Sequence, residues 1–104
     1  MKFNNQPSEI FKDKEILLLE DDLLLGKRIA AFLEKSGAEI THCQSLEEAR
    51  RALTDLSFDA ALFDLNLPDG DSLELLREGI VPQSTSAVLM TGEGGIRSAV
   101  EAIQ

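Results

Sequence analysis

The sequence predicts an α/β domain built on a parallel β-sheet, and three observations support this prediction. Short apolar runs alternate along the chain with stretches of helical periodicity. The first run, residues 15–20, is continuously apolar between acidic ends, which is typical of a parallel strand buried on both faces. The chain has 104 residues and contains no linker rich in Pro, Gly or Ser, so it can form one domain but not two.

The first helix is predicted directly after this strand. Asp22 is its expected N-cap, and Gly37 follows its end. Its inward face is given by apolar residues at helical spacing: Leu25, Ile29, Phe32 and Leu33. A second strand is expected at 38–43. The next helix opens on a capping box formed by Ser45 and Glu48, and its inward positions are Leu46, Ala49, Leu53 and Leu56.

The second half of the chain repeats the alternation. Residues 68–70, Pro-Asp-Gly, predict a tight turn after the third strand. The expected elements are a strand at 60–64, a loop at 65–70, a helix from 71 or 72 to 78, a strand at 86–90 and a fourth helix whose apolar positions run from 96 to 103. We assign residues 1–13 to an N-terminal extension and residues 14–104 to the domain.

Composition excludes several classes of function. The net charge of −9 and a pI near 4.4 oppose direct binding of nucleic acid. No strictly apolar run is longer than five residues, far short of the roughly 20 residues that cross a bilayer, and the polar N-terminus does not resemble a secretory signal. His42 and the single cysteine, Cys43, are too few for a zinc site, and we expect both to be ordinary strand residues. A cytoplasmic location without a membrane partner is therefore expected.

Acidic residues stand where the predicted strands end. Glu20, Asp21 and Asp22 follow the first strand, Asp64 ends the third, and Thr91 follows the fourth. The carboxyl ends of parallel strands meet at one edge of a sheet, where α/β proteins bind their ligands. Carboxylates gathered there repel one another unless a divalent cation joins them, and oxygen ligands suit Mg²⁺. The pattern predicts a Mg²⁺-dependent phosphoryl site.

Each of these residues also has a purely structural interpretation. Acidic strand ends are common in so acidic a chain, Asp64 can bond the local backbone, and the Thr91 hydroxyl can begin a helix. The glycine-rich segment 92–95 matches neither GxGxxG nor GxxxxGK[ST], so it does not favour a nucleotide site. The joint placement at three strand ends favours the shared site.

The sequence resembles the receiver domain of response regulators in two-component signalling. Three segments within 14–104 carry the resemblance: ILLLEDD at 16–22, FDLNLPDG at 63–70 and VLMTG at 88–92. It implies a flavodoxin-like three-layer sandwich with parallel strand order 2-1-3-4. It also implies a signalling domain rather than an enzyme, with transcription regulation as its expected output.

The resemblance further implies roles for individual residues. Asp64 would accept a phosphoryl group from a phosphohistidine on a sensor histidine kinase, and Thr91 would hydrogen-bond that group and act as a switch. The implied Mg²⁺ ligands are Asp21 and Asp64 directly, Glu20 through water, and the backbone carbonyl of Asn66.

The chain departs from the family pattern at its end. Receiver domains have five strands and five helices, with a lysine followed by proline at the end of strand five, whereas this sequence stops at Gln104. Arg97 is the nearest basic residue after Thr91, and nothing assigns it the task of that lysine. We therefore expect a shortened receiver, missing strand five and helix five. Its sheet would have one undercovered face and an open edge at 86–90, through which a homodimer or an exchange of elements can form.

Two other functions stay open. One is a receiver-like interaction or dimerisation module that is not phosphorylated. The other is an aspartate-nucleophile phosphatase, which is less favoured because such enzymes carry a second Asp two residues after the nucleophile, where this chain has Asn66.

Overall fold

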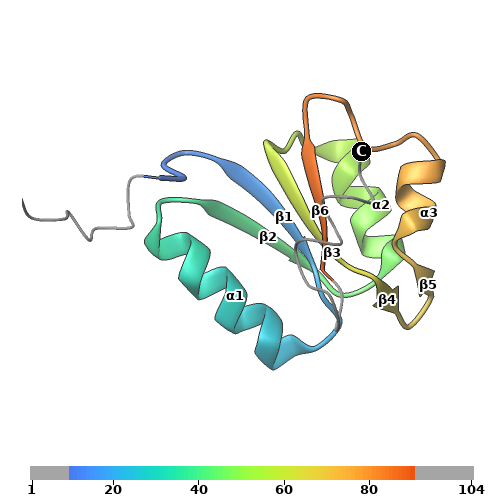
Figure 1. Ribbon diagram of the computed structural model, residues 1–104, viewed down its shortest axis with the longest axis horizontal. Helices are drawn as coiled ribbons and strands as arrows, with labels where there is room; N and C mark the ends of the chain where they lie inside the picture. Colours follow the sequence, from blue (N-terminus) through green and yellow to red (C-terminus); the bar gives the residue numbers. More distant parts are fainter. Residues whose placement is uncertain (1–9, 91–104) are drawn as a thin grey trace, which may run out of the picture.

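A four-stranded parallel sheet forms the centre of the molecule in the computed structural model, which describes residues 10–90 (Figure 1). Its strand order is β2-β1-β3-β6, with every neighbouring pair parallel. The strands are β1 (Glu15–Leu19), β2 (Glu39–Cys43), β3 (Ala60–Asp64) and β6 (Ser86–Met90). Since β6 is the predicted fourth strand, the predicted order is confirmed.

Helices cover both faces of the sheet. The first, α1 (Leu23–Lys35), lies against one face, and α2 (Leu46–Asp55) and α3 (Leu73–Arg77) lie against the other (Figure 1). The predicted three layers are therefore present. Within residues 10–90, no helix combines the length and hydropathy needed to cross a bilayer. Thr91 and the predicted helix at 96–103 lie outside the described residues.

The helix starts follow the predicted caps, with one difference. The Asp22 carboxylate accepts a hydrogen bond from the backbone N–H of Leu25 (3.0 Å), and the Ser45 hydroxyl accepts one from the N–H of Glu48 (3.2 Å). The return bond of the capping box comes from Gln44, whose N–H donates to the Glu48 carboxylate (2.9 Å). The glutamate therefore reaches one residue further back than the sequence motif predicts.

The segment after β3 contains more structure than the predicted loop and turn. Two short strands, β4 (Asn66–Leu67) and β5 (Gly70–Asp71), pair antiparallel on either side of Pro68 and Asp69. The third helix then begins at Leu73, slightly later than predicted. The Asp71 carboxylate accepts a hydrogen bond from the N–H of Leu73 (2.7 Å), whereas the N-cap residue, Ser72, makes no side-chain cap bond.

The two faces of the sheet have cores of different size. The buried cluster on the α1 face consists of Ile16, Leu33 and Ala38. The cluster under α2 and α3 is larger and includes Leu17, Leu19, Leu46, Ala49, Leu53, Phe58, Phe63, Leu75 and Leu89. Because β1 is apolar on both sides, it contributes to both clusters and is the most deeply buried strand. The most deeply buried strand therefore leads directly to Glu20 and Asp21.

Candidate functional site

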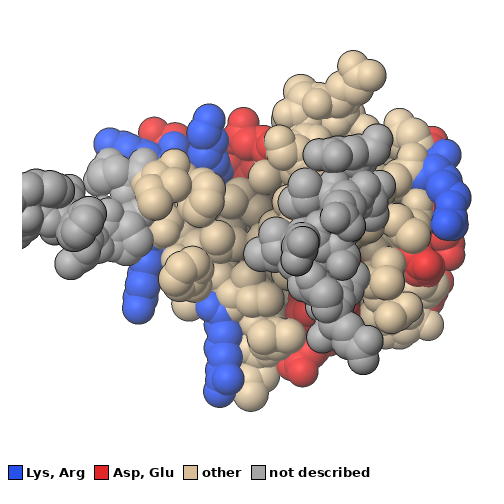
Figure 2. Space-filling view, viewed as in Figure 1, with Lys and Arg blue, Asp and Glu red and all other residues tan. Residues whose placement is uncertain are grey.

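Three acidic side chains meet at the carboxyl edge of the sheet. Glu20 and Asp21 follow β1, and Asp64 ends β3; one carboxylate oxygen from each lies within 4.8 Å of the others. The sheet register explains their proximity, because Leu19 pairs with Phe63 and the next residues of both strands emerge side by side. We call these three residues the acidic cluster. Acidic side chains are visible along the lower edge of the space-filling view, where the strands end (Figure 2).

Of the other two predicted site residues, Asn66 and Thr91, the structure describes only Asn66. Asn66 is exposed and begins β4, two residues after Asp64. Thr91 directly follows Met90, the last residue of β6, and falls outside the described residues. The structure thus brings together three of the five predicted site residues and describes a fourth nearby.

The loop that carries Glu20 and Asp21 is tied to the end of β2. The Glu20 N–H donates to the carbonyl of Cys43 (2.9 Å), and the Gln44 side-chain amide donates to the carbonyl of Asp21 (3.3 Å). The Glu20 carboxylate in turn accepts a hydrogen bond from the N–H of Asp22 (3.0 Å). These bonds fix the direction in which the loop presents its carboxylates.

The acidic cluster has an excess of negative charge. Glu20 is only 5% exposed, Asp64 is half-buried and Asp21 is exposed. Burial, followed by the charges of Asp64 and Asp21, raises the pKa of Glu20 above its ordinary value, although the bond from the Asp22 N–H opposes this. Burial, followed by the charge of Asp21, raises the pKa of Asp64. Among residues 10–90, no lysine or arginine forms an ion pair with the cluster.

The chemistry of these donors fits a hard divalent cation. All three residues offer carboxylate oxygens, the ligands that Mg²⁺ and Ca²⁺ prefer. The nearby Cys43 does not add a soft ligand, because it is buried and burial raises the pKa of its thiol to about 11. Asp21 is exposed and Asp64 is half-exposed, so solvent can reach both carboxylates. A cation here would neutralise the charge that raises the pKa values of Glu20 and Asp64.

A family model described as the response regulator receiver domain matches residues 16–104. The chain belongs to this family. Among its relatives, the swarming motility regulation protein RssB of Serratia marcescens is 36% identical over 89 residues, which cover 85% of this chain and 41% of RssB. The photosynthetic apparatus regulatory protein RegA of Cereibacter sphaeroides is 34% identical over 99 residues, covering 92% and 53%. The chain therefore spans about half the length, or less, of these relatives.

Solved structures confirm the flavodoxin-like fold. A response regulator receiver domain protein (CheY-like) from Methanospirillum hungatei JF-1 has a TM-score of 0.76 at 26% identity and covers 88% of this chain and 74% of its own. A response regulator from Burkholderia pseudomallei, with a phosphorylated aspartic acid and a calcium ion, shares the fold with a TM-score of 0.76 at 24% identity, over 88% and 54%. Receiver domains are signalling modules that histidine kinases phosphorylate, and they bind a divalent metal in an acidic pocket.

Two polar residues of this receiver have contacts that the sequence does not reveal. His42 lies in β2 as predicted, but its Nε2 is 2.9 Å from the carbonyl oxygen of Glu20. Asp69 lies in the predicted turn, yet its carboxylate accepts hydrogen bonds from the N–H groups of Leu46 (2.9 Å) and Glu47 (3.2 Å). Both contacts join residues more than twenty positions apart, so no local motif indicates them.

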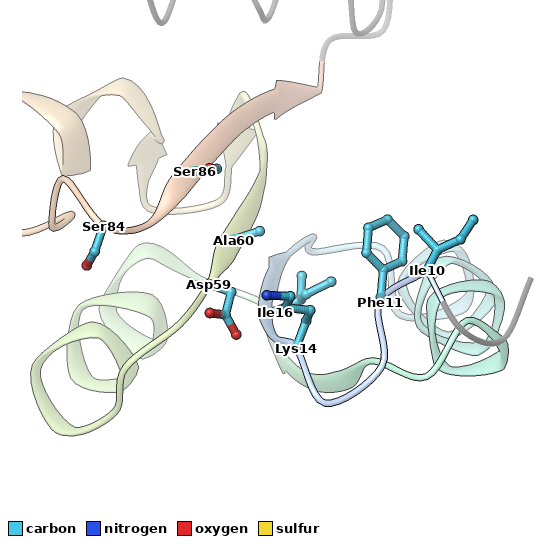
Figure 3. Close-up of a pocket in the computed structure, with 8 residues that line it drawn as sticks. All are labelled: Ile10, Phe11, Lys14, Ile16, Asp59, Ala60, Ser84 and Ser86. Carbon is cyan, nitrogen blue, oxygen red and sulfur yellow. The ribbon is translucent and has the colours of Figure 1, made fainter.

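The opposite edge of the receiver's sheet holds a pocket of about 500 Å³ (Figure 3). It is lined by Ile10, Phe11, Lys14, Ile16, Asp59, Ala60, Ser84 and Ser86, which lie around the amino ends of β1, β3 and β6. The acid that lines the pocket, Asp59, already has a partner, because its carboxylate accepts a hydrogen bond from the N–H of Glu15 (2.8 Å). The acidic cluster and this pocket are therefore separate features at opposite ends of the strands.

Proposed function

We propose that this chain is the phosphoacceptor receiver of a response regulator, in which Asp64 accepts a phosphoryl group from the phosphohistidine of a sensor histidine kinase. The observation that carries the proposal is the acidic cluster, with carboxylate oxygens within 4.8 Å of one another in a chain of the receiver family. Phosphorylation would control an output outside the described residues, and we propose transcription regulation as that output.

The proposed reaction is a transfer between two side chains. The N–P bond of the phosphohistidine breaks, a bond forms between an Asp64 carboxylate oxygen and phosphorus, and the leaving imidazole takes up a proton. Asp64 is half-buried at the end of β3, so its carboxylate is held by the sheet while part of it faces the solvent. The product is an acyl phosphate, a hydrolysable mark that suits a switch.

The cofactor that we propose is Mg²⁺. Asp21 and Asp64 would bind it directly, Glu20 through water, and the backbone carbonyl of Asn66 would be a further ligand. Bound there, Mg²⁺ supplies positive charge that stabilises the oxygens of the transferring phosphoryl group. Thr91, which follows β6, would donate a hydrogen bond to that group and bias the conformation of the segment after it.

Mass spectrometry tests the proposal. We expect the chain to gain the mass of one phosphoryl group when incubated with Mg²⁺ and a small acyl phosphate donor. The gain should be lost in Asp64→Asn and after chelation of the metal. Asp59→Asn is the matched control, since it changes an acid at the opposite edge of the sheet, and it should be phosphorylated like the wild type. Phosphorylation of Asp64→Asn, or none of the wild type, contradicts the proposal.

A second candidate function is an interaction module that works through contacts alone. Within residues 10–90, β6 lies at the margin of the sheet and pairs only with β3. Its residues 87–90 are all apolar, and an apolar marginal strand is prone to pair with another chain. A stable homodimer in sedimentation measurements, together with no gain of phosphoryl mass, would favour this candidate over the first.

A further inference from the structure

We propose that His42 is a positioning residue for the acidic cluster: its side-chain N–H holds the carbonyl of Glu20 and so fixes the loop that presents Glu20 and Asp21. This inference rests on the proposed function, because it assigns His42 a part in binding the cation. It gives a role to a side chain that the sequence alone indicates as an ordinary strand residue.

The hydrogen bond itself is well defined. Nε2 of His42 lies 2.9 Å from the carbonyl oxygen of Glu20, in a partly buried position. A carbonyl oxygen can only accept, so Nε2 carries the proton in this contact. Partial burial shields the bond from competing water, which makes it worth more than a bond at the open surface.

Gly26 shows that the imidazole ring has a fixed place. This glycine is buried in α1, and a Cβ atom built on it would overlap Cε1 and Nε2 of His42. The ring therefore occupies the space that any other residue at position 26 would need. It is held between the helix backbone on one side and the Glu20 carbonyl on the other, so its N–H has a fixed direction.

Neighbouring hydrogen bonds from the end of β2 hold the same loop as His42. Cys43 and Gln44 bind the N–H of Glu20 and the carbonyl of Asp21, so three successive residues at the end of β2 hold the same short loop. His42 and Gln44 bind the loop through their side chains, and the contact of His42 is the shorter and the more buried of the two. Without a cation, the carboxylates of the cluster repel one another, and the hydrogen bond from His42 to the Glu20 carbonyl opposes their separation. The cation then meets ligands that are already in place.

Two substitutions separate the N–H from the ring. His42→Phe keeps a ring of similar size beside Gly26 and removes the donor, whereas His42→Gln restores a side-chain N–H at a similar reach. We expect calorimetric titration of the 104-residue chain with Mg²⁺ to give a Kd raised roughly 10-fold in His42→Phe and within about threefold of wild type in His42→Gln. Thr41→Val is the matched control on the opposite face of β2, and its Kd should not change.

Either of two results would overturn the inference. His42→Phe could bind Mg²⁺ as tightly as the wild type, or both His42 variants could lose affinity equally, which would mean that packing and not the N–H matters. If the wild type itself binds no Mg²⁺, the proposed function fails, and amide hydrogen exchange without metal then decides the role of His42.

That second measurement follows the Asp22 amide, which donates to the Glu20 carboxylate and so reports the geometry of the loop. In His42→Phe we expect its exchange to become several-fold faster, to return in His42→Gln, and to leave the Leu18 amide in the centre of β1 unchanged. Unchanged exchange at Asp22 in His42→Phe refutes the positioning role.

Discussion

Asp64, the last residue of β3, and Asp69, in the connection from β3 to α3, lie five residues apart and have opposite surroundings. Both carboxylate oxygens of Asp69 accept backbone N–H groups at the start of α2, from Leu46 and Glu47, and these bonds lower the pKa of Asp69. Burial and the charge of Asp21 raise the pKa of Asp64. One carboxylate is surrounded by donors, and the other by a low-dielectric environment and like charge.

We interpret Asp69 as a structural acid and Asp64 as the acid of the proposed phosphoryl site. Asp69 satisfies N–H groups that the first turn of α2 leaves without a partner, and its negative charge is favourable at a helix N-terminus. Burial and the charge of Asp21 make the charge of Asp64 unfavourable, and a cation at the proposed site would offset this. The carboxylate of Asp69 is thus stabilised by hydrogen bonds, whereas the negative charge of the Asp64 carboxylate is not balanced by a nearby cation among residues 10–90.

The affinity for Mg²⁺ should show the largest difference between substitutions in the acidic cluster and a substitution of Asp69. Asp64→Asn and Asp21→Asn each remove a proposed ligand, so we expect the Kd for Mg²⁺ to rise by on the order of 100-fold in calorimetry. Asp69→Asn should stay within about twofold of the wild type, because Asp69 is occupied by backbone N–H groups. A large loss of affinity in Asp69→Asn would show that the two carboxylates do not act separately.

A substitution at Gly70 tests how the packing of the connection between β3 and α3 against α2 contributes to stability. Its φ is +144°, and a Cβ atom there would lie 2.8 Å from Cδ1 of Leu46 and 2.7 Å from a carboxylate oxygen of Glu74. We expect Gly70→Ala to lower the free energy of unfolding by about 2 kcal/mol in denaturant titrations. Gly79→Ala is the matched control: its φ is also positive, at +74°, but apart from its chain neighbours no atom of residues 10–90 lies within 4 Å of the added Cβ, so this substitution should lower the free energy of unfolding by about 1 kcal/mol. Equal losses would mean that contact with α2 contributes nothing.

Without metal, Asp64→Asn and Asp69→Asn should change the free energy of unfolding in opposite directions. Asp64→Asn removes a charge from the acidic cluster, and we expect it to raise the free energy of unfolding at pH 7 by about 0.5 to 1 kcal/mol, a modest value because Asp64 is half-exposed. Asp69→Asn should lower the stability, since the amide accepts the same two N–H groups less strongly. Chemical denaturation in a chelating buffer measures both, and changes of the same sign would contradict the comparison.

The pH dependence should show the smallest effect. Because the pKa values of Glu20 and Asp64 are raised, the folded chain binds protons more tightly than the unfolded chain, and stability without metal should fall as the pH rises above about 4. Asp69 acts in the opposite sense: its contribution is present above its ordinary pKa of 3.8 and is lost as the pH falls.

We expect the cluster's effect to be a few tenths of a kcal/mol, reduced in Asp64→Asn and removed by saturating Mg²⁺. Denaturation series between pH 4 and pH 7, with and without Mg²⁺, measure it. A wild-type stability that rises with pH more steeply than that of Asp64→Asn would reverse the assignment.

The sheet was open to prediction because its signals are local. Buried parallel strands appear as short apolar runs, and Asp22 and Ser45 mark helix starts that depend only on the next few residues. The gathering of Glu20 and Asp64 followed from strand order alone, since acids at the ends of adjacent parallel strands emerge together. The roles given to these residues, and to Thr91, remain predictions.

The remaining features depend on tertiary contacts. The bonds of His42 to Glu20 and of Asp69 to Leu46 join residues 22 and 23 positions apart, and no spacing rule connects them. Strands β4 and β5 have two residues each, too few to show an alternating pattern. Sequence periodicity therefore located the acidic cluster but not the contacts that support it.

A crystal structure of the chain with Mn²⁺, located by its anomalous scattering, tests the central claim most directly. We predict one ion at the carboxyl edge of the sheet, with oxygens of both Asp21 and Asp64 at about 2.0 to 2.3 Å. No ion at this edge in Mn²⁺-saturated crystals, or an ion bound by only one of the two carboxylates, would contradict a shared metal site.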